Sequence, residues 1–296
     1  MKARLLRIST TLILLLFIGW LIGEIFQDRY WLTGVLFFLP SPFVAAVLIL
    51  SGILARKLQH PKLSRLFLSL SILPLLFVLF VENDFFKKKP EALTDTLTLV
   101  HWNVWWDTMG PNNQARKIQS IDADLFALSE APDQLDNLQN FHSLRRGPFL
   151  FLSKYPISHL KAISRKPLTA NLLQWETPHG DLTILMADLP SGLQFHRHPL
   201  LTDLVNQLEP NKVDILVGDF NSPRRSLALQ TLPNGYTHAY NSVGTGLSYT
   251  YPPFLPILSL DQCIHGPNIH PIRYDLQSTF LSDHKMQVFK FTIKDK

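Results

Sequence analysis

The sequence is poor in cysteine: Cys263 is the only one among 296 residues. A single cysteine excludes an intrachain disulfide, so the fold must be held together by its hydrophobic core. Cys263 lies in the apolar run LSLDQCI, where a small buried side chain is the simplest interpretation and no partner for thiol catalysis is evident. Internal repeats and low-complexity tracts are also absent. The length is sufficient for one large domain or two modest ones.

The second part of the chain lacks net positive charge. Residues 1–90 contain 11 of the 28 lysines and arginines and 4 of the 23 acidic residues, so this segment carries +7 and residues 91–296 carry −2. The basic isoelectric point therefore belongs to the N-terminal segment and gives no argument for nucleic-acid binding. Individual arginines such as Arg224 and Arg225 could still steer an anionic substrate.

Long apolar runs are confined to the first 90 residues, at 8–23, 30–55 and 66–81. Each is long enough, or nearly so, to cross a bilayer as a helix. The prolines within the second and third runs would break a strand but only kink a membrane helix. No small-x-small cleavage site follows the first run, which argues against a signal peptide. We predict a three-helix transmembrane anchor over residues 1–81 and a short polar linker at 82–96.

Basic residues predict the orientation of this anchor. They precede the first run and fill the loop between the second and third: Lys2, Arg4, Arg7, Arg56, Lys57, Lys62 and Arg65. Such residues favour the cytoplasmic side, although the lysines at 87–89 argue mildly for the opposite arrangement. With three spans, we expect a multi-pass protein of the plasma (inner) membrane with a cytoplasmic N-terminus and an extracytoplasmic C-terminal domain. The lipid bilayer is then a partner of the chain.

From Leu97 to the end, short apolar runs alternate with amphipathic segments. Strands are predicted at 97–104, 123–129, 148–154, 170–176, 181–187, 213–219, 258–264 and 286–293, with helices at 113–121, 197–208 and 223–232. This alternation predicts an α/β domain over 97–296, in which two packed β-sheets are flanked by helices as a four-layer α/β/β/α sandwich.

Five polar motifs follow one another through this domain: HWNV (101–104), LSEA (128–131), GDFN (218–221), SLDQC (259–263) and SDHK (282–285). Each one places an Asn, Asp, Glu or His at the end of an apolar strand-like run. Side chains at strand ends can converge on one pocket, and these side chains are mostly hard oxygen ligands. The motifs together resemble the endonuclease/exonuclease/phosphatase superfamily, the fold of deoxyribonuclease I. The three-span N-terminus resembles that of membrane-anchored bacterial members.

The resemblance implies metal-assisted hydrolysis of a phosphate ester by water, with Mg²⁺ as the cofactor and Mn²⁺ as its alternative. Asn103 and Glu130 match the metal-binding pair of the family, and Asp283 matches a ligand or a residue next to one. A carboxylate at a buried strand end is costly unless a cation meets it. For Asn103 alone, a turn-forming asparagine explains the position equally well.

The remaining matches concern the reaction itself. Asp219 and Asn221 match the pair that orients the attacking water and contacts phosphate or metal, and their spacing of two places them on one side of an extended chain. An Asx-turn at the strand exit is the structural alternative. His284 matches the imidazole that contacts phosphate, and Asp261 matches the carboxylate that fixes its tautomer.

One position departs from the family pattern. Where relatives usually have a phosphate-contacting histidine, this chain has Asp188 in the sequence ADLP. A carboxylate there repels phosphate unless it is protonated or bound to a cation. Three interpretations stay open: Asp188 ligates another metal, His196 or His198 takes over the contact, or activity is weakened or lost.

The substrate is a phosphate ester of either a phospholipid headgroup or a nucleic acid. The apolar, proline-rich run YPPFLPIL (251–258) either contacts the bilayer or is the ordinary loop that precedes the strand of Asp261. The alternative to a phosphodiesterase is a non-catalytic membrane receptor or scaffold that keeps the fold and has lost activity through Asp188.

Overall fold

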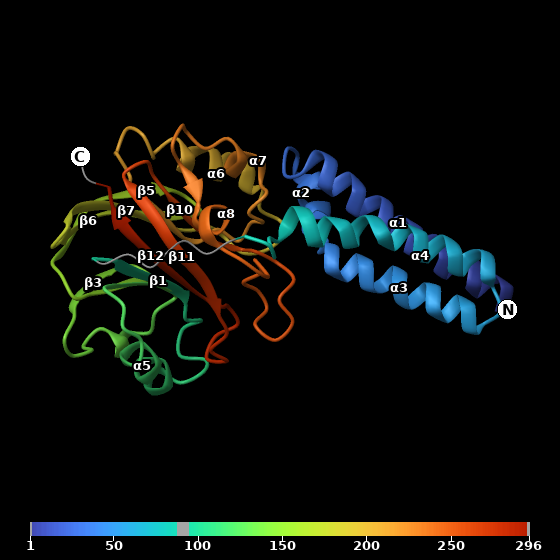
Figure 1. Cartoon of the computed structure of the whole chain (residues 1–296), viewed down its shortest axis with the longest axis horizontal. Coiled ribbons are helices and arrows are strands. Elements are labelled where there is room, and N and C mark those ends of the chain that lie inside the picture. Colours follow the sequence, from blue (N-terminus) through green and yellow to red (C-terminus); the bar gives the residue numbers. More distant parts are fainter. Residues whose placement is uncertain (1, 88–94, 295–296) are drawn as a thin grey trace. The chain divides into compact units, whose positions relative to one another are not determined.

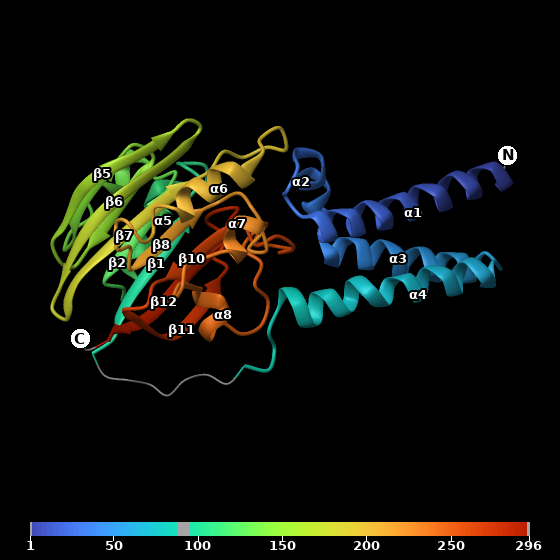
Figure 2. The same cartoon turned by 90° about the horizontal axis from the view of Figure 1, so that it is seen from above.

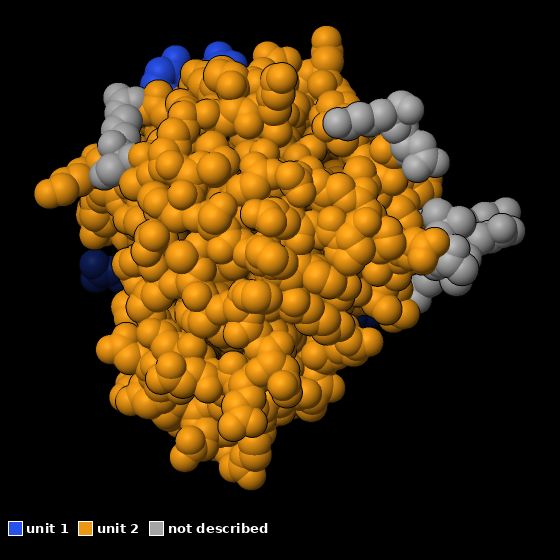
Figure 3. Space-filling model, turned by 90° about the vertical axis from the view of Figure 1, so that its left-hand side faces the viewer, with its two compact units in different colours: residues 1–85 blue, residues 86–296 orange. Residues whose placement is uncertain are grey.

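The computed structural model describes residues 2–87 and 95–294, and its contacts divide the chain into two compact units, Met1–Phe85 and Phe86–Lys296 (Figure 3). The predicted linker at 82–96 contains this boundary. Its central residues, 88–94, lie outside the described part of the chain, and with them Lys88 and Lys89. The predicted domain limits at 81 and 97 therefore stay predictions.

The first unit is helical. Its elements are α1 (Lys2–Phe26), α2 (Trp31–Phe37), α3 (Ser41–Lys57), α4 (Pro61–Phe77) and the π-helix Val78–Glu82 (Figure 1). Two stretches, Arg4–Phe26 and Pro61–Glu82, are long and apolar enough to cross a membrane. In the described residues the possible spans number two, or three if α2 and α3 form one bent span.

The second predicted span, expected as a kinked helix at 30–55, is divided into two helices. It consists of α2 and α3, which are bent by 61° relative to each other. Pro40 caps the start of α3, and a proline can neither donate a backbone hydrogen bond nor leave its preceding residue in a helical conformation. The three-span count is therefore not confirmed.

Polar groups inside the helical unit form a satisfied chain. Trp20 Nε1 donates a hydrogen bond to Ser41 Oγ at 3.0 Å, and that hydroxyl donates to Glu82 Oε1 at 2.7 Å. These contacts join α1, α3 and the π-helix, because buried polar groups in an apolar bundle are stable only when they are paired.

The second unit consists of two mixed β-sheets. The first has the strand order β11-β12-β1-β2-β4-β3, and its strands are β1 (Leu97–Asn103), β2 (Leu125–Ser129), β3 (His142–Arg146), β4 (Phe149–Ser153), β11 (Ile269–Gln277) and β12 (Met286–Ile293). The second has the order β5-β6-β7-β8-β10-β9, and its strands are β5 (Ile157–Arg165), β6 (Leu168–Thr177), β7 (Gly180–Asp188), β8 (Ile215–Asp219), β9 (Thr237–His238) and β10 (Asp261–His265). β1 and β2 pair in parallel, as do β7 and β8, whereas the other pairs are antiparallel.

Helices cover the outer faces of the two sheets (Figures 1 and 2). α5 (Pro111–Gln119) packs through Ile118 on the first sheet, and α6 (Arg197–Val205) and α7 (Leu227–Gln230) pack on the second. The short helices α8 (Ala239–Val243) and Asp133–Leu135 complete the described elements. The inner faces meet in a core that contains Leu97, Trp175 and Phe289. The prediction of two packed sheets flanked by helices is confirmed.

The eight predicted strands are all present, and the four that were not predicted are the edges of the sheets. β3 and β11 flank the first sheet, and β5 and β9 flank the second. β3 contains no fully buried residue, and β11 alternates between buried and exposed positions. Edge strands face solvent and therefore lack the continuous apolar runs that identified the central strands.

Gly218 sets the spacing between β7 and β8. Its φ is +154°, and a Cβ atom there would lie 1.8 Å from the carbonyl oxygen of Ala187 in the neighbouring strand. No side chain fits this space without moving the strand that ends in Asp188. Glycine at this place is therefore required by the close approach of two strands.

We predict that Gly218→Ala lowers the free energy of unfolding of the second unit by about 3 kcal/mol, since it combines backbone strain with overpacking. Gly147→Ala is the control, because Gly147 also has a positive φ, +59°, but no atom lies within 4 Å of an added Cβ. It should cost only about 1–2 kcal/mol. Near-UV circular dichroism of the full chain in detergent during chemical unfolding measures both. Equal losses would show that the contact with Ala187 is unimportant.

Candidate active site

The polar motif residues lie at inward-facing positions of their strands. In β1, Leu97 and Leu99 face the core between the sheets, whereas Val100 and Trp102 face α5. The two-residue period of a strand makes His101 and then Asn103 the following inward positions. Asp188, Asp219 and Asp261 continue the inward sets of β7, β8 and β10 in the same way. Four predicted site residues thus meet where the core between the sheets ends.

The carboxyl groups of Asp188, Asp219 and Asp261 form a row across the second sheet. Asp188 is the Cα partner of Asp219, and Asp219 is the partner of Asp261. Asp219 and Asp261 are buried, at 1% exposure each. Like charges directly opposite on adjacent strands are destabilising, and burial increases the cost. The row is therefore stable only with protons, cations or hydrogen-bond donors placed against it.

Asn103 joins the first sheet to this row. Its Nδ2 donates to Asp219 Oδ2 at 3.1 Å, and its Oδ1 accepts from the backbone N–H of Trp105 at 3.0 Å. Its carbonyl oxygen accepts from Ser282 Oγ at 2.6 Å, which ties the 282–284 segment to the end of β1. The backbone N–H of Asn221 donates to Asp219 Oδ1 at 2.9 Å, so both oxygens of Asp219 are held.

His284 and Asp261 form a buried pair. His284 Nδ1 and Asp261 Oδ2 are 2.8 Å apart, and His284 Nε2 lies 3.7 Å from Asp219 Oδ2. Burial alone lowers the pKa of His284, but Asp261 and Asp219 together raise it to about 10. Burial likewise raises the pKa of Asp261, yet the neighbouring His284 brings it below its ordinary value. The imidazole is therefore a cation at neutral pH, oriented by Asp261.

The other acids have raised pKa values. Burial, with the negative charges of Asp219 and Glu130, raises the pKa of Asp188 to about 8. Burial and the charge of Asp261 raise the pKa of Asp219 to about 6, despite the opposing charge of His284. Burial also raises the pKa of Glu130, which follows β2 in a left-handed conformation, and that of the half-buried Asp283. A hydrogen bond from Asn103 partly opposes the rise at Glu130.

These residues fit a divalent cation. Five carboxyl groups act on one another here, and the cations His284 and Arg197 act on them. Asp261 Oδ1 is buried without a hydrogen-bond partner, and it lies 3.8 Å from His101 Nδ1. Asp219, Asp261 and His284 offer ligand atoms within 4.8 Å of one another. Because His284 is bound to Asp261 and cationic, the oxygens of Asn103, Glu130, Asp188 and Asp219 are better ligands than its nitrogen.

Two residues of this site, Arg197 and Thr250, were not predicted. Arg197 is buried between the half-buried His196 and His198, and it donates to the carbonyl oxygens of Pro190 and Gly192 at 3.1 and 2.8 Å. Burial lowers its pKa to about 10, while Asp219 acts in the opposite direction. Thr250 Oγ1 accepts from the backbone N–H of Asp261 at 3.2 Å. The motif spacing gave no signal for either residue, because both act through contacts distant in sequence.

A buried polar chain lies below the site. His101 contacts Ser129 Oγ at 3.2 Å and Gln287 Nε2 at 3.1 Å, and Gln287 Oε1 accepts from Tyr274 OH at 2.8 Å. Burial lowers the pKa of His101 to about 4, so its imidazole is neutral. This histidine therefore adds no positive charge to the carboxylates and instead satisfies polar groups in the core.

Solved structures share this fold. A humanized D. rerio TDP2 is 18% identical over 67% of this chain and 99% of its own, with a TM-score of 0.55. The human Nocturnin catalytic domain with bound sulfate is 16% identical over 72% and 97%, with a TM-score of 0.53. A family protein from Bacteroides thetaiotaomicron is 13% identical over 70% and 100%, also with a TM-score of 0.53. At these identities the likeness concerns the fold alone.

Sequence comparison gives the family directly. Among curated proteins, none matches the chain. Residues 100–284 match the model of the Endonuclease/Exonuclease/phosphatase family, and this range contains the Asn, Asp, Glu and His residues of every polar motif described above. The match covers more than half of the sequence, and the resemblance predicted from the motifs is confirmed. The chain belongs to the endonuclease/exonuclease/phosphatase family.

Proposed function

We propose that this protein is a membrane-anchored, divalent metal-dependent phosphodiesterase that uses an activated water. The observation that carries the proposal is the row of Asp188, Asp219 and Asp261 beside a cationic His284. Members of the family are hydrolases that act on phosphodiester bonds, which agrees with this chemistry. A scaffold that had lost activity would have no need to keep buried like charges in register.

The metal in this proposal is Mg²⁺, with Mn²⁺ as a substitute, held by Glu130, Asn103 and Asp283. When bound, it polarises the phosphoryl oxygen and stabilises the leaving group. We assign Asp188 to the same cation cluster, because burial and the neighbouring acids Asp219, Glu130 and Asp261 raise its pKa to about 8. If Asp188→His raised hydrolysis while metal affinity stayed constant, this assignment would be wrong.

The chain's own residues carry the proton and charge steps. Asp219, whose two oxygens are held by Asn103 and the N–H of Asn221, orients the attacking water and accepts its proton. His284 stabilises the negative charge that develops on the phosphoryl group, and Asp261 keeps its ring oriented and charged. Asn221, at the strand exit next to Asp219, is proposed to contact phosphate or metal.

We propose that the apolar helices anchor the chain in the plasma (inner) membrane with a cytoplasmic N-terminus. Basic residues in the first two turns of α1, in the last turn of α3 and in the first two turns of α4 support this orientation. If α2 and α3 act as one bent span, the count is odd and the family domain is extracytoplasmic. A reporter fused after Lys296 decides the matter, since a reporter active only in the cytoplasm would contradict this topology.

Two phosphodiester classes are compatible with this site. A D. rerio TDP2 structure contains a single-strand DNA product, which illustrates a nucleic-acid substrate on the same fold. Residues 91–296 carry a net charge of −2, which gives little attraction for a polyanion. A nuclease loses affinity steeply as salt rises, whereas hydrolysis of neutral lipid headgroups should not.

We predict that Asp219→Asn reduces turnover of bis-p-nitrophenyl phosphate by about 10³-fold while the fold is retained, because the water loses its base and the shape is unchanged. Asp181→Asn is the matched control, since Asp181 is exposed at the opposite end of β7. Steady-state rates with and without EDTA measure the effect. Full, EDTA-sensitive activity in Asp219→Asn would disprove the assigned role.

Metal binding should strengthen as pH rises from 6 to 8. Asp219 and Asp188 have pKa values of about 6 and 8, so protons occupy them below these values and must leave before a cation can bind beside them. We expect roughly tenfold higher Mn²⁺ affinity per pH unit for each proton displaced. Calorimetry in buffers of different ionisation enthalpy counts these protons. In Asp188→Asn the dependence above pH 7 should disappear, and pH-independent binding to the unaltered protein would contradict the model.

A further inference from the structure

An exposed apolar tip is formed by the loop before β10 together with the segment between β11 and β12. We define the apolar tip as Phe254, Leu255 and Phe280. Phe254 is 74% exposed and Leu255 70%, and the ring of Phe254 stacks on that of Phe280, itself 58% exposed, at 5.3 Å. Residues 251–258 contain no charged side chain. Large apolar side chains gathered at the surface indicate a contact with another apolar phase.

The loop is held rigidly. Tyr251 N–H donates to Leu258 O at 3.0 Å, and Leu258 N–H donates back to Tyr251 O at 2.9 Å, which closes the loop at its base. Three of the six residues between them are prolines, at positions 252, 253 and 256. Proline fixes φ, so little conformational freedom remains to be lost when the tip contacts a partner.

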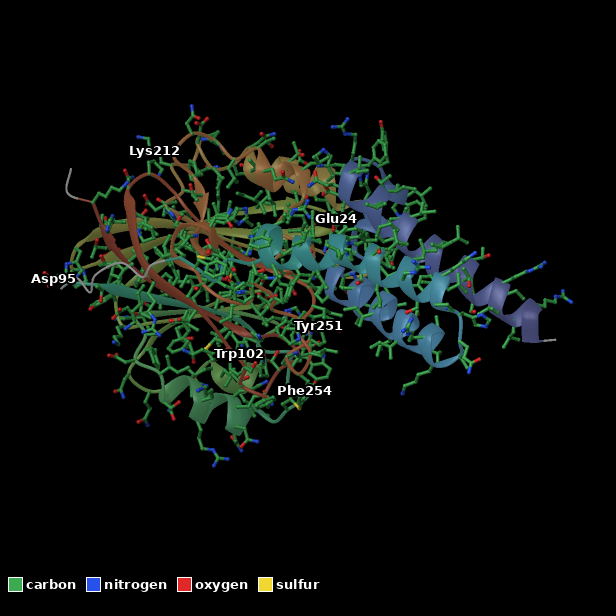
Figure 4. The ribbon with its side chains drawn as sticks, turned by 45° about the vertical axis from the view of Figure 1, so that its right-hand side comes forward. Glu24, Asp95, Trp102, Lys212, Tyr251 and Phe254 are labelled. Carbon is green, nitrogen blue, oxygen red and sulfur yellow. The ribbon has the colours of Figure 1, made fainter. Side chains whose placement is uncertain are left out.

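The base of this loop touches the proposed active site. The rings of Tyr251 and His284 are 5.1 Å apart, and Thr250, the residue before Tyr251, accepts hydrogen bonds from the backbone N–H groups of Asp261 and Lys285. Figure 4 shows Tyr251 and Phe254 on the same loop. A surface or bilayer that the apolar tip contacts therefore lies next to His284 and Asp261.

Trp106 extends the same rim on the side of the first sheet. It is 48% exposed, and Gln114 Nε2 donates both to its carbonyl oxygen, at 3.0 Å, and to that of Leu281, at 3.4 Å. Leu281 follows Phe280 directly, so Trp106 is close to the apolar tip. Tryptophan favours the interface between water and lipid headgroups.

The proposed membrane anchor would keep the family domain close to a lipid bilayer. The π-helix ends at Glu82 and β1 begins at Leu97, so 14 residues connect a candidate membrane span to the family domain. A fully extended chain of that length reaches at most about 50 Å. The tether holds the apolar tip at a high effective concentration beside the bilayer, and contact with lipid becomes an intramolecular event.

We infer that the apolar tip and Trp106 enter the headgroup region of the bilayer in which the chain is anchored, and that the substrate is a phosphodiester of a bilayer lipid. The substrate class rests on the proposed function. In this arrangement the phosphodiester of a membrane lipid meets His284 and Asp219 without leaving the bilayer. The apolar tip favours amphiphilic substrates because it places the active site at the bilayer surface. The residues of the acidic cluster carry out the hydrolysis.

Fluorescence tests the contact with lipid. The native Cys263 is 2% exposed and burial raises the pKa of its thiol, so Phe254→Cys can be labelled selectively with an environment-sensitive NBD probe. In the full chain reconstituted into phosphatidylcholine/phosphatidylglycerol vesicles, we expect a blue-shifted emission that is quenched by doxyl-labelled lipid and protected from iodide. Asp181→Cys, at an exposed site remote from the tip, should show the reverse.

Two results would overturn the lipid contact. Iodide quenching at position 254 equal to that at 181 would show that the tip stays in water. Protection from both iodide and doxyl lipid would show that a protein surface, such as a second copy of this chain, covers the tip instead.

Hydrolysis rates on a lipid and on a soluble substrate distinguish a failure of this inference from a failure of the proposed function. The double variant Phe254→Ser/Leu255→Ser should lose at least tenfold in phospholipid hydrolysis in vesicles and keep the unaltered rate on bis-p-nitrophenyl phosphate. Equal rates on both substrates in the variant and the unaltered chain would overturn the inference and leave the phosphodiesterase intact. Absence of turnover of either substrate by the unaltered chain would overturn the proposed function and with it the lipid substrate, while the NBD result would still decide whether the tip enters the bilayer.

Discussion

Three carboxyl groups in register on one face of a sheet are the constraint around which this domain is arranged. Strand pairing brings Asp188, Asp219 and Asp261 side by side, and the two-residue period turns all three inward. Burial makes their mutual repulsion expensive. A cationic imidazole and an amide donor from the opposite sheet offset it, and Asp188 itself keeps a proton at neutral pH because its pKa rises to about 8. A bound divalent cation would neutralise the remaining negative charge. The same ion would therefore stabilise the site and support the proposed hydrolysis.

The sequence predicted the interior of the fold well and its periphery poorly. Central strands are continuous apolar runs that end in a polar residue, so their positions and the residues at their ends could be read directly. Edge strands such as β3 and β5 carry no such signal, because solvent faces them. The kinked helix expected at 30–55 is two helices bent by 61° near Pro40, since the pattern gives hydrophobicity but does not determine how sharply a proline bends the chain.

The composition of the site was also only partly predictable. Asn103, Asp219, Asp261 and His284 are joined by the hydrogen bonds and ion pairs described above, as convergence of the motifs required. Arg197 and Thr250 entered the site without any motif, because their roles come from packing between segments far apart in sequence. Motifs thus identify residues that end strands, whereas supporting residues become visible only when the fold is known.

The central claim is that these oxygens together hold a divalent cation, and anomalous diffraction from crystals of the full chain soaked with Mn²⁺ tests it most directly. The account predicts an anomalous peak whose nearest protein atoms are side-chain oxygens of Glu130 and Asn103, with the Asp188 and Asp219 carboxylates beside them, and its loss in Glu130→Gln. A cluster free of anomalous density at saturating Mn²⁺, in crystals of active protein, would contradict it.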